Sequence, residues 1–337
     1  MIAILADDFS GAAELAGIAA ARGCKAEVQT VFDPSSDAEV VAVDTDTRLK
    51  SESEAARIVN DVARAISATK PAWIYKKTDS VLRGHVRVEI EAVLSATGQR
   101  DCVFIPANPS KGRVIRAGRY LVNGVPLEET VFAMDPDFPR RSSDVRELLG
   151  DSARIHVPDV VCVDDLKREV DASTLVAGAA DFFTELIGGE PIPPVRVPWS
   201  KTLLLCGSLA AWDMGRPVEM FQRGFAVKTI EEPVSPAIWR NTSKLMLAVG
   251  RPQNAGVATL IEKLVEMAIP LVEGRNDLRI CLEGGATAMA FIRRMGWSRF
   301  EVVPEGHVGV GSLRPAGGPV LCVKPGSYPW PELCLAV

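Results

Sequence analysis

Short apolar runs rich in valine and isoleucine alternate along this chain with segments whose apolar residues recur at helical spacing. This order of strand and then helix is typical of parallel α/β sheets that carry helices on their faces. The expected strands are residues 2–6, 27–31, 40–43, 73–75, 102–105, 202–206, 244–249, 278–282 and 320–323. The expected helices are residues 12–22, 52–68, 86–96, 177–186, 257–266 and 288–295. The sequence therefore predicts an α/β fold with largely parallel sheets.

The segment 188–200 divides the chain. It reads GGEPIPPVRVPWS and places two glycines and four prolines between a predicted helix and a predicted strand. Such a stretch interrupts both periodicities and is typical of a linker between domains. A chain of 337 residues is long enough for two domains. We predict two α/β domains, residues 1–195 and residues 196–337.

The charge balance argues against large polyanionic partners. Lys plus Arg is 38 and Asp plus Glu is 43, a formal net charge of −5, so no basic excess points to nucleic acid. The longest apolar runs are far shorter than the roughly 20 residues that span a bilayer, and no basic segment precedes the first strand. We expect no nucleic acid, no membrane and a cytoplasmic location. The sequence is compatible with a homo-oligomer, although no segment defines an interface.

The cysteines and histidines give no metal signature. None of the seven cysteines has a CxxC partner, and the three histidines are far from one another and from every cysteine in the sequence. This pattern excludes a recognisable zinc site and favours buried thiols in a reducing compartment. The sequence identifies no protein ligand for any metal ion.

Polar side chains follow three of the predicted strands. Asp7 and Asp8 follow the strand 2–6, Arg48 follows the strand 40–43, and the dense block KKTDSVLRG at 76–84 follows the strand 73–75. Ligands of open α/β sheets bind outside the carboxyl ends of the strands, so these groups are expected at one ligand-binding edge. Arginine offers a planar fork of donors that matches a carboxylate. A capping turn, a surface arginine and a solvated charged loop remain the alternatives.

Glycine-rich turns follow the strands of the second half. They are CGS at 206–208, EGGAT at 283–287 and KPGS at 324–327. Glycine lets backbone N–H groups approach phosphates closely, and a helix N-terminus favours their charge. Neither a GxxxxGK[ST] loop nor a GxGxxG turn after a strand is present. Tight turns that need a positive φ angle are the alternative explanation.

Taken together, these motifs resemble those of the four-carbon acid sugar kinases, over essentially the whole chain. The stretch ADDFSG at 6–11 is similar to the opening ADD-[FL]-[TS]-G of that family, and 76–84 is similar to its KK-[TI]-DS-[TV]-LRG block. Pro106-Ala107 to Gly112-Arg113 and the stretch VNGVPL at 122–127 resemble its P-A-x-P-x-x-GR and V-x-G-x-P-[LV] motifs. Several motifs in the same order make the resemblance specific.

The resemblance implies a sugar-acid-binding amino-terminal domain, a nucleotide-binding carboxy-terminal domain and a cleft between them. The implied reaction is the ATP-dependent, Mg²⁺-assisted phosphorylation of a hydroxyl on threonate, erythronate or an oxo-tetronate. An aspartate would orient the attacking hydroxyl, and either Asp8 or Asp79 suits that catalytic role. The candidate substrate-binding residues are Asp7, Asp8, Arg48, Lys77, Thr78, Asp79, Ser80 and Arg83. The candidate ATP-binding residues are Ser208, Gly284, Gly285, Ala286, Thr287 and Gly326.

The second half departs from the family pattern. The GGET turn of the family reads GGAT at 284–287, and its K-x-G-x-F-G ending reads KPGSYP at 324–329. The chain is also shorter than expected for such kinases. Two alternatives follow: a protein that binds or senses sugar acids without phosphoryl transfer, and a different enzyme, such as an isomerase or hydrolase, built on the same site.

Overall fold

The chain forms two compact units in the computed structural model, which describes residues 1–135, 137–251, 256–306, 309–324 and 329–335. The first unit comprises Met1–Leu15 and Gln29–Pro191, and the second comprises Ala16–Val28 and Ile192–Val337. The division after residue 191 falls inside the segment 188–200. Residues 16–28, which the sequence analysis assigned to the first domain, belong to the second unit. The functional assignment of the two domains is a prediction at this point.

The sheet of the first unit consists of parallel strands in the order β3-β1-β4-β10-β5-β9. Strand β2 (Ala26–Gln29) lies at the boundary of the two units. The strand bounds are Val40–Asp44 (β3), Ile2–Ala6 (β1), Trp73–Lys77 (β4), Thr174–Gly178 (β10), Asp101–Ile105 (β5) and Ile155–His156 (β9). The helix bounds are Phe9–Ala20 (α1), Glu52–Ala68 (α2), Val86–Thr97 (α3), Val145–Leu149 (α4) and Ala180–Ile187 (α5).

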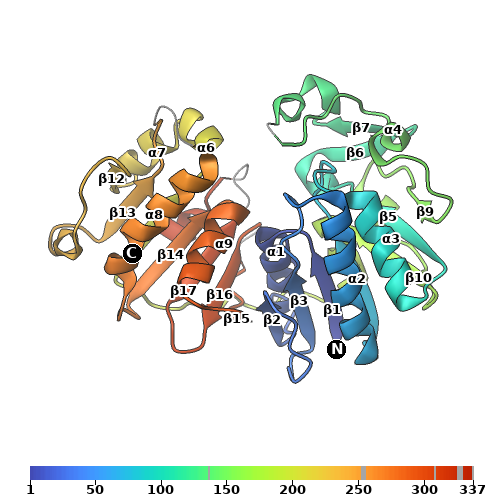
Figure 1. Cartoon of the computed structure of the whole chain (residues 1–337), viewed down its shortest axis with the longest axis horizontal. Coiled ribbons are helices and arrows are strands. Elements are labelled where there is room, and N and C mark those ends of the chain that lie inside the picture. The colour runs from blue at the N-terminus through green and yellow to red at the C-terminus, as the bar shows by residue number, and fades with distance from the viewer. Residues whose placement is uncertain (136, 252–255, 307–308, 325–328, 336–337) are drawn as a thin grey trace. The chain divides into compact units, whose positions relative to one another are not determined.

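Helices cover both faces of this sheet. Successive side chains of a strand point to opposite faces, and neighbouring residues of β4 contact helices on each of them. On β4, the ring of Tyr75 lies 5.2 Å from that of Phe183 on α5. The next residue, Lys76, pairs with Glu89 of α3 on the other face at 2.8 Å. Helices α2 and α3 pack side by side (Figure 1). The sheet is therefore buried on both faces, which explains its near-continuous apolar strands.

A small antiparallel sheet interrupts the α/β pattern between β5 and α4. We call residues 106–144 the insert. Its strands pair in the order β6-β7-β8. The bounds are Arg113–Arg116 (β6), Arg119–Val122 (β7) and Val125–Pro126 (β8). Short 3₁₀ turns occupy Pro109–Lys111, Leu127–Glu129 and Val131–Met134 in the insert and Val163–Leu166 after it.

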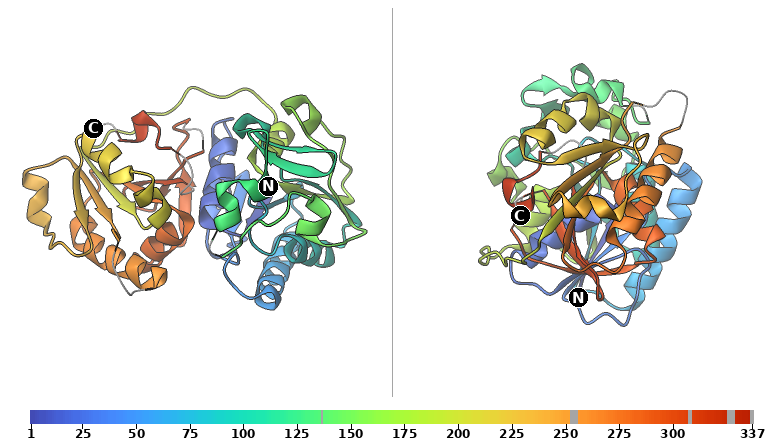
Figure 2. Two further views of the ribbon diagram at one scale, coloured as in Figure 1. Left: turned by 90° about the horizontal axis from the view of Figure 1, so that it is seen from above. Right: turned by 90° about the vertical axis from the view of Figure 1, so that its left-hand side faces the viewer.

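The second unit has parallel strands in the order β12-β13-β11-β14-β17, and β16 and β15 extend this order with antiparallel pairing. In each unit, helices flank the sheet on both sides (Figure 2). The strand bounds are Ala226–Thr229 (β12), Lys244–Ala248 (β13), Lys201–Cys206 (β11), Leu278–Glu283 (β14), Val320–Lys324 (β17), Gly311–Pro315 (β16) and Arg299–Val302 (β15). The helix bounds are Leu209–Asp213 (α6), Arg216–Gln222 (α7), Val257–Val272 (α8), Gly285–Arg294 (α9) and Glu332–Leu335 (α10), and a 3₁₀ turn spans Pro236–Arg240.

The mostly parallel α/β fold is confirmed, but one helix was predicted to begin too early. Ala177 lies in strand β10, where it pairs with Lys76 and Phe104, and helix α5 begins only at residue 180. The strand ends at Gly178, whose φ is +152° and where a Cβ would lie 2.0 Å from the carbonyl oxygen of Ile105. Strand β10 was missed because the apolar run Leu175–Ala177 is short and lies directly before the helix, and its last residue was assigned to that helix.

The described helices are too short or too polar to cross a membrane.

Candidate functional site

The carboxyl ends of β3, β1 and β4 lie next to one another. Ala6 at the end of β1 pairs with Asp44 of β3 on one side and with Lys77 of β4 on the other. The chain therefore leaves all three strands at the same edge of the sheet. The polar residues that follow these strands meet there, as the sequence predicted.

Arg48 joins the two aspartates that follow β1. Its Nε and Nη2 donate to the two carboxylate oxygens of Asp7 at 2.7 and 3.0 Å. Its Nη1 donates to Oδ2 of Asp8 at 2.8 Å. Burial alone would raise the pKa of Asp7, but the charge and hydrogen bonds of Arg48 outweigh it and lower that pKa. Asp7 is thus a buried carboxylate committed to Arg48, whereas the Asp8 side chain keeps 16% of its surface exposed.

Asp8 also caps helix α1. Its Oδ1 accepts a hydrogen bond from the backbone N–H of Gly11 at 2.9 Å, and its Oδ2 accepts one from the Ser10 hydroxyl at 2.6 Å. These bonds satisfy groups that the first helical turn leaves unpaired. A Cβ at Gly11 would lie 2.7 Å from Oδ1 of Asp8, so glycine leaves room for this carboxylate. The capping alternative raised for Asp8 is therefore real, and it also fixes the carboxylate in place.

Asp79 is enclosed by the loop that it begins. Its Oδ2 accepts the backbone N–H groups of Val81 and Arg83 at 3.0 and 3.2 Å, and its Oδ1 accepts Nη2 of Arg83 at 2.7 Å. Nη1 of Arg48 lies 4.0 Å from the same Oδ1. Burial would raise the pKa of Asp79, but the charges of Arg83 and Arg48 hold it well below its usual range. Asp79 therefore ties this loop to Arg48.

The two lysines of β4 point to opposite faces. Lys76, fully buried, pairs with Glu89, whose other oxygen accepts the Thr47 hydroxyl at 2.6 Å. Lys77 donates to the carbonyl of Thr78 at 2.9 Å and lies 3.6 Å from Glu14 on α1. Only Lys77 is thus on the α1 side, where Asp8 begins the helix.

The insert packs onto the loop at 79–83. Arg113 donates to the Ser80 hydroxyl, and the Tyr120 hydroxyl donates to the Ser80 carbonyl. Nη1 of Arg140 donates to the carbonyl of Leu82 at 2.8 Å. The sequence analysis did not assign these three residues to the site. The GR motif signalled the stretch around Arg113, but no local pattern linked the insert to this loop.

Three buried polar atoms near this edge have no hydrogen-bond partner among the described residues: Oδ2 of Asp44, Oγ1 of Thr78 and Nε of Arg83. The other oxygen of Asp44 accepts the backbone N–H of Asp46 at 2.9 Å. Burial, the largest cause, raises the pKa of Asp44 well above its ordinary value, and the charges of Asp46, Asp8 and Asp7 add to it. Asp44 is therefore the carboxyl here that most favours its protonated form.

The glycine turns of the second unit come together at the ends of neighbouring strands. Cys206 at the end of β11 pairs with Glu283 at the end of β14. A Cβ at Gly207 would lie 2.3 Å from the Thr287 hydroxyl oxygen, so the two turns are in close contact. Gly284, with φ at +96°, precedes α9 and donates its backbone N–H to the carbonyl of Lys324 at 2.9 Å. Among the described residues, the only atom within 4 Å of a Cβ there would be the Thr287 hydroxyl oxygen at 3.9 Å.

Two other residues predicted to bind ATP, Ser208 and Ala286, lie at the N-terminal ends of helices. The Ser208 hydroxyl accepts the backbone N–H of Ala211 at 3.2 Å and so caps α6. Ala286 is exposed in the first turn of α9. The predicted ATP-binding residue Gly326 lies outside the described residues.

The charges of the second unit at this edge are buried. Lys324 of β17 lies 2.7 Å from Oε1 of Glu283, and Nη2 of Arg216 lies 2.9 Å from the same oxygen. Glu283 and Lys324 are fully buried. Burial lowers the pKa of Lys324, although Glu283 opposes this shift. This cluster was not predicted from the sequence, where its signal is a charged residue at the end of each of two apolar strands, Glu283 in β14 and Lys324 in β17.

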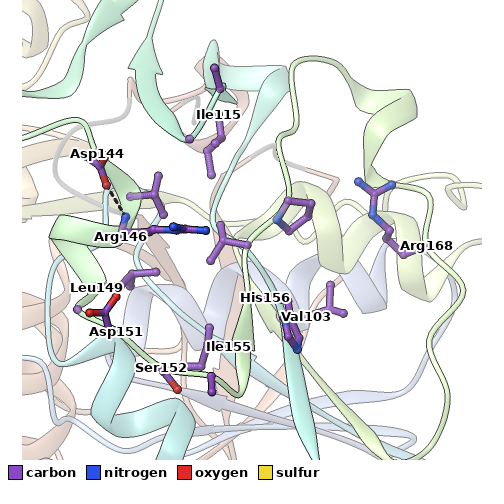
Figure 3. A pocket seen from close by; sticks show the side chains of 17 residues that line it. Val103, Ile115, Asp144, Arg146, Leu149, Asp151, Ser152, Ile155, His156 and Arg168 are labelled. Carbon is purple, nitrogen blue, oxygen red and sulfur yellow. Dashed lines mark hydrogen bonds between the residues drawn. The ribbon is translucent and has the colours of Figure 1, made fainter.

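A cavity of about 1050 Å³ lies elsewhere in the first unit, between α4 and the edge strand β9 (Figure 3). Val103 and Ile115 contribute apolar surface, Arg146 points into it from α4, and His156 and Arg168 lie on the opposite side. None of the predicted site residues lines this cavity. Among the residues that the structure describes, no group of three or more His, Cys, Asp or Glu side chains could hold a metal ion.

Comparisons with known proteins give the family. Residues 2–182 match the model of the sugar-binding N-terminal domain. The chain is 36% identical to a D-threonate kinase of Bordetella bronchiseptica, over 97% of this chain and 94% of that protein. It is 32% identical to a D-threonate kinase of Salmonella typhimurium over 66% of this chain, and that match spans 52% of the relative.

A solved structure has the same fold. A Haemophilus influenzae protein of a domain family of unknown function superposes with a TM-score of 0.70 at 17% identity, covering 98% of each chain. The match to the family model covers more than half of the chain, and the Bordetella relative aligns over nearly all of it. The chain therefore belongs to the family of the sugar-binding N-terminal domain, the family of the four-carbon acid sugar kinases.

Proposed function

We propose that this protein transfers the γ-phosphoryl group of ATP to a hydroxyl of a four-carbon sugar acid such as threonate, erythronate or an oxo-tetronate. The names of the two kinase relatives support the reaction and the substrate class. The observation that carries the proposal in this chain is Asp8, a partly exposed carboxylate held by Arg48, Ser10 and Gly11 at the carboxyl edge of the sheet.

Asp8 is our choice for the residue that accepts the proton of the attacking hydroxyl. A general base needs an accessible oxygen in a fixed position. Three hydrogen bonds fix the carboxylate of Asp8, and its side chain is partly exposed. Asp79 suits this role less, because its oxygens accept two backbone N–H groups and Arg83, and because a depressed pKa makes a carboxylate a weak base. We assign Asp79 to the architecture of the loop.

The other first-unit candidates then divide by what their polar atoms contact. Asp7 positions Arg48 by accepting two hydrogen bonds from its guanidinium. Arg48 holds Asp8 and offers its two remaining N–H groups to the hydroxyls of the substrate. Lys77 contributes positive charge on the α1 side, while Thr78, Ser80 and Arg83 shape the loop.

We assign the nucleotide to the second unit. Ser208 and the turn at 284–287 would approach the phosphates with backbone N–H groups, aided by the N-terminus of the ten-residue helix α9. Magnesium would bridge the phosphate oxygens and neutralise charge in the transition state. Since no described cluster holds a metal by itself, its protein ligands would number one or two, with phosphate and water completing the shell. A cytoplasmic location belongs to the same proposal.

The test is ADP formation by the purified protein with Mg-ATP and a panel of four-carbon sugar acids. We expect one acid to raise ADP formation well above the rate without substrate, and Asp8→Asn to abolish that increase. Exposed Asp61→Asn on α2 is the matched control. Binding of an acid without ADP formation would instead favour the sugar-acid-binding alternative that Ala286 motivates. Conversion of an acid without ATP would indicate a different enzyme.

A further inference from the structure

The first unit uses most of its site cations internally. Arg48 is paired with Asp7 and Asp8, Arg83 is paired with Asp79 and Asp135, and Lys77 faces Glu14. A sugar acid brings a further negative charge, its own carboxylate. Recognition of that carboxylate needs a cation whose charge is not already balanced.

Arg140 of the insert differs from these cations. Its Nη1 donates to the carbonyl of Leu82 at 2.8 Å and its Nε to the carbonyl of Phe138 at 2.8 Å. Both acceptors are neutral, and within the described residues no carboxylate forms an ion pair with this guanidinium. One N–H of Nη1 and both N–H groups of Nη2 are left for another partner.

The surroundings of Arg140 disfavour its charge. Burial, the largest cause, lowers its pKa, and neighbouring Arg83 lowers it further, while Asp79 and Asp135 only partly oppose this. An anion bound at Arg140 would relieve this imbalance. The guanidinium is also steered, because its centre lies 6.0 Å from the ring of Phe138. It is therefore a half-buried cation held in place by neutral groups.

Arg140 is connected to the proposed reaction site. It binds the carbonyl of Leu82, a buried residue whose φ of +64° bends the loop begun by Asp79. Asp79 in turn lies 4.0 Å from Arg48, which holds Asp8. Arg140 and Asp8 thus contact the same chain of groups from its two ends.

We propose that Arg140 binds the carboxylate of the sugar acid and selects acids over neutral polyols of the same length. The proposal rests on the proposed function, since it concerns the same substrate. The remaining N–H of Nη1 and one of the two N–H groups of Nη2 form the fork that matches a carboxylate in a bidentate pair. The carboxylate end of the substrate then lies at the insert, and its reacting hydroxyl lies at Asp8.

The experiment compares the acid that binds best with its amide, which keeps the carbon chain and the hydroxyls but lacks the charge. Affinity by calorimetric titration and kcat/KM with Mg-ATP are measured for the wild type, Arg140→Gln and Arg140→Lys. Arg141→Gln, at an exposed neighbouring position, is the matched control. Melting temperatures confirm that each variant is folded.

We expect Arg140→Gln to weaken binding of the acid by about 10- to 100-fold and binding of the amide by less than about 3-fold. Arg140→Lys should restore part of the affinity for the acid, and kcat should change less than KM. Equal losses for acid and amide would overturn the proposal, as would unchanged binding, or an acid-specific loss seen in Arg48→Gln instead. A wild-type protein that binds no sugar acid would overturn the proposed function together with it.

Discussion

The two units expose their sheet edges in opposite ways. In the first unit, the edge formed by β3, β1 and β4 carries ionised side chains, of which Asp8 and Arg48 are each 16% exposed. In the second unit, the edge formed by β11, β14 and β17 buries its charged groups, Glu283 and Lys324, completely and presents glycine turns instead.

The proposed ligands of the two edges account for this difference in the exposure of charged side chains. A small polyhydroxy acid offers directional hydroxyls and one carboxylate, so its recognition needs side chains at fixed positions. Phosphates are bound well by backbone N–H groups at a helix N-terminus, so close approach matters more than side-chain chemistry. We propose that the partly exposed charges of the first-unit edge, Asp8 and Arg48, serve the site, whereas the buried pair Glu283 and Lys324 of the second unit stabilises the fold.

The largest effect should come from Asp8→Asn in the first unit. Loss of the proton acceptor should lower kcat by about 10²- to 10⁴-fold. The melting temperature should change little, because asparagine has nearly the same shape as aspartate. Steady-state kinetics with the preferred acid and a thermal scan measure both quantities. Asp61→Asn should change neither. A kcat within threefold of the wild type would remove Asp8 from the mechanism.

Glu283→Gln in the second unit should act on stability instead. It removes the negative charge that buried Arg216 and Lys324 share, with Glu219 still pairing with Arg216, and this should lower the free energy of unfolding by about 3 kcal/mol. Urea denaturation followed by circular dichroism measures this loss. Glu262→Gln, on the exposed side of α8, is the control. An unchanged unfolding midpoint would mean that the cluster does not support the fold.

Gly11→Ala separates activity from stability within one helix. The added methyl would lie 2.7 Å from Oδ1 of Asp8 and 3.3 Å from Cγ of Lys77, so the carboxylate must move. We expect kcat to fall by about tenfold, because a small displacement of a catalytic carboxylate slows the reaction. The free energy of unfolding should change little, since alanine favours the helix. Gly17→Ala on the same helix meets only ordinary contacts at 3.7 Å or more and should leave kcat unchanged. Equal kinetics for the two variants would contradict the proposed position of Asp8.

Asp44→Asn should have the smallest effect, and the effect should depend on pH. Because the pKa of Asp44 is raised above its ordinary value of 3.8, the folded state holds this proton to higher pH than the unfolded state does. Folding stability is therefore lost as pH rises from about 4 through the raised pKa. Asparagine removes this loss, so the variant should be more stable than the wild type at pH 8, and the difference should be much smaller at pH 4. Melting temperatures across this range measure the gap, and a gap that shrinks with rising pH would refute the assignment.

The sequence could predict what depends on local periodicity and on strand ends. Runs of valine and isoleucine located most strands, and the order of the chain placed Asp8, Arg48 and Asp79 at one edge. It could not predict that Arg48 would bind two aspartates, because that pairing joins residues about forty positions apart. The contacts of Arg113 and Arg140 depend on how the insert folds back, which no local pattern encodes.

The sequence also could not predict which charged side chains are buried and paired. Lys324 ends an apolar strand, and no local pattern indicated that Glu283 would be its partner. The same holds for Lys76, whose charge is balanced by Glu89 inside the fold. Local sequence shows that a charge is present, but only the three-dimensional neighbours decide whether it is available to a ligand.

The most direct test of this account is a crossed titration of the wild type, Asp8→Asn and Gly285→Pro with the preferred sugar acid and with Mg-ATP. Proline is tolerated at the first position of α9 but removes its backbone N–H. We predict that Asp8→Asn weakens binding of the acid while keeping the affinity for Mg-ATP, and that Gly285→Pro does the reverse. Loss of nucleotide affinity in Asp8→Asn, with acid binding intact, would contradict the assignment of the two ligands to the two units.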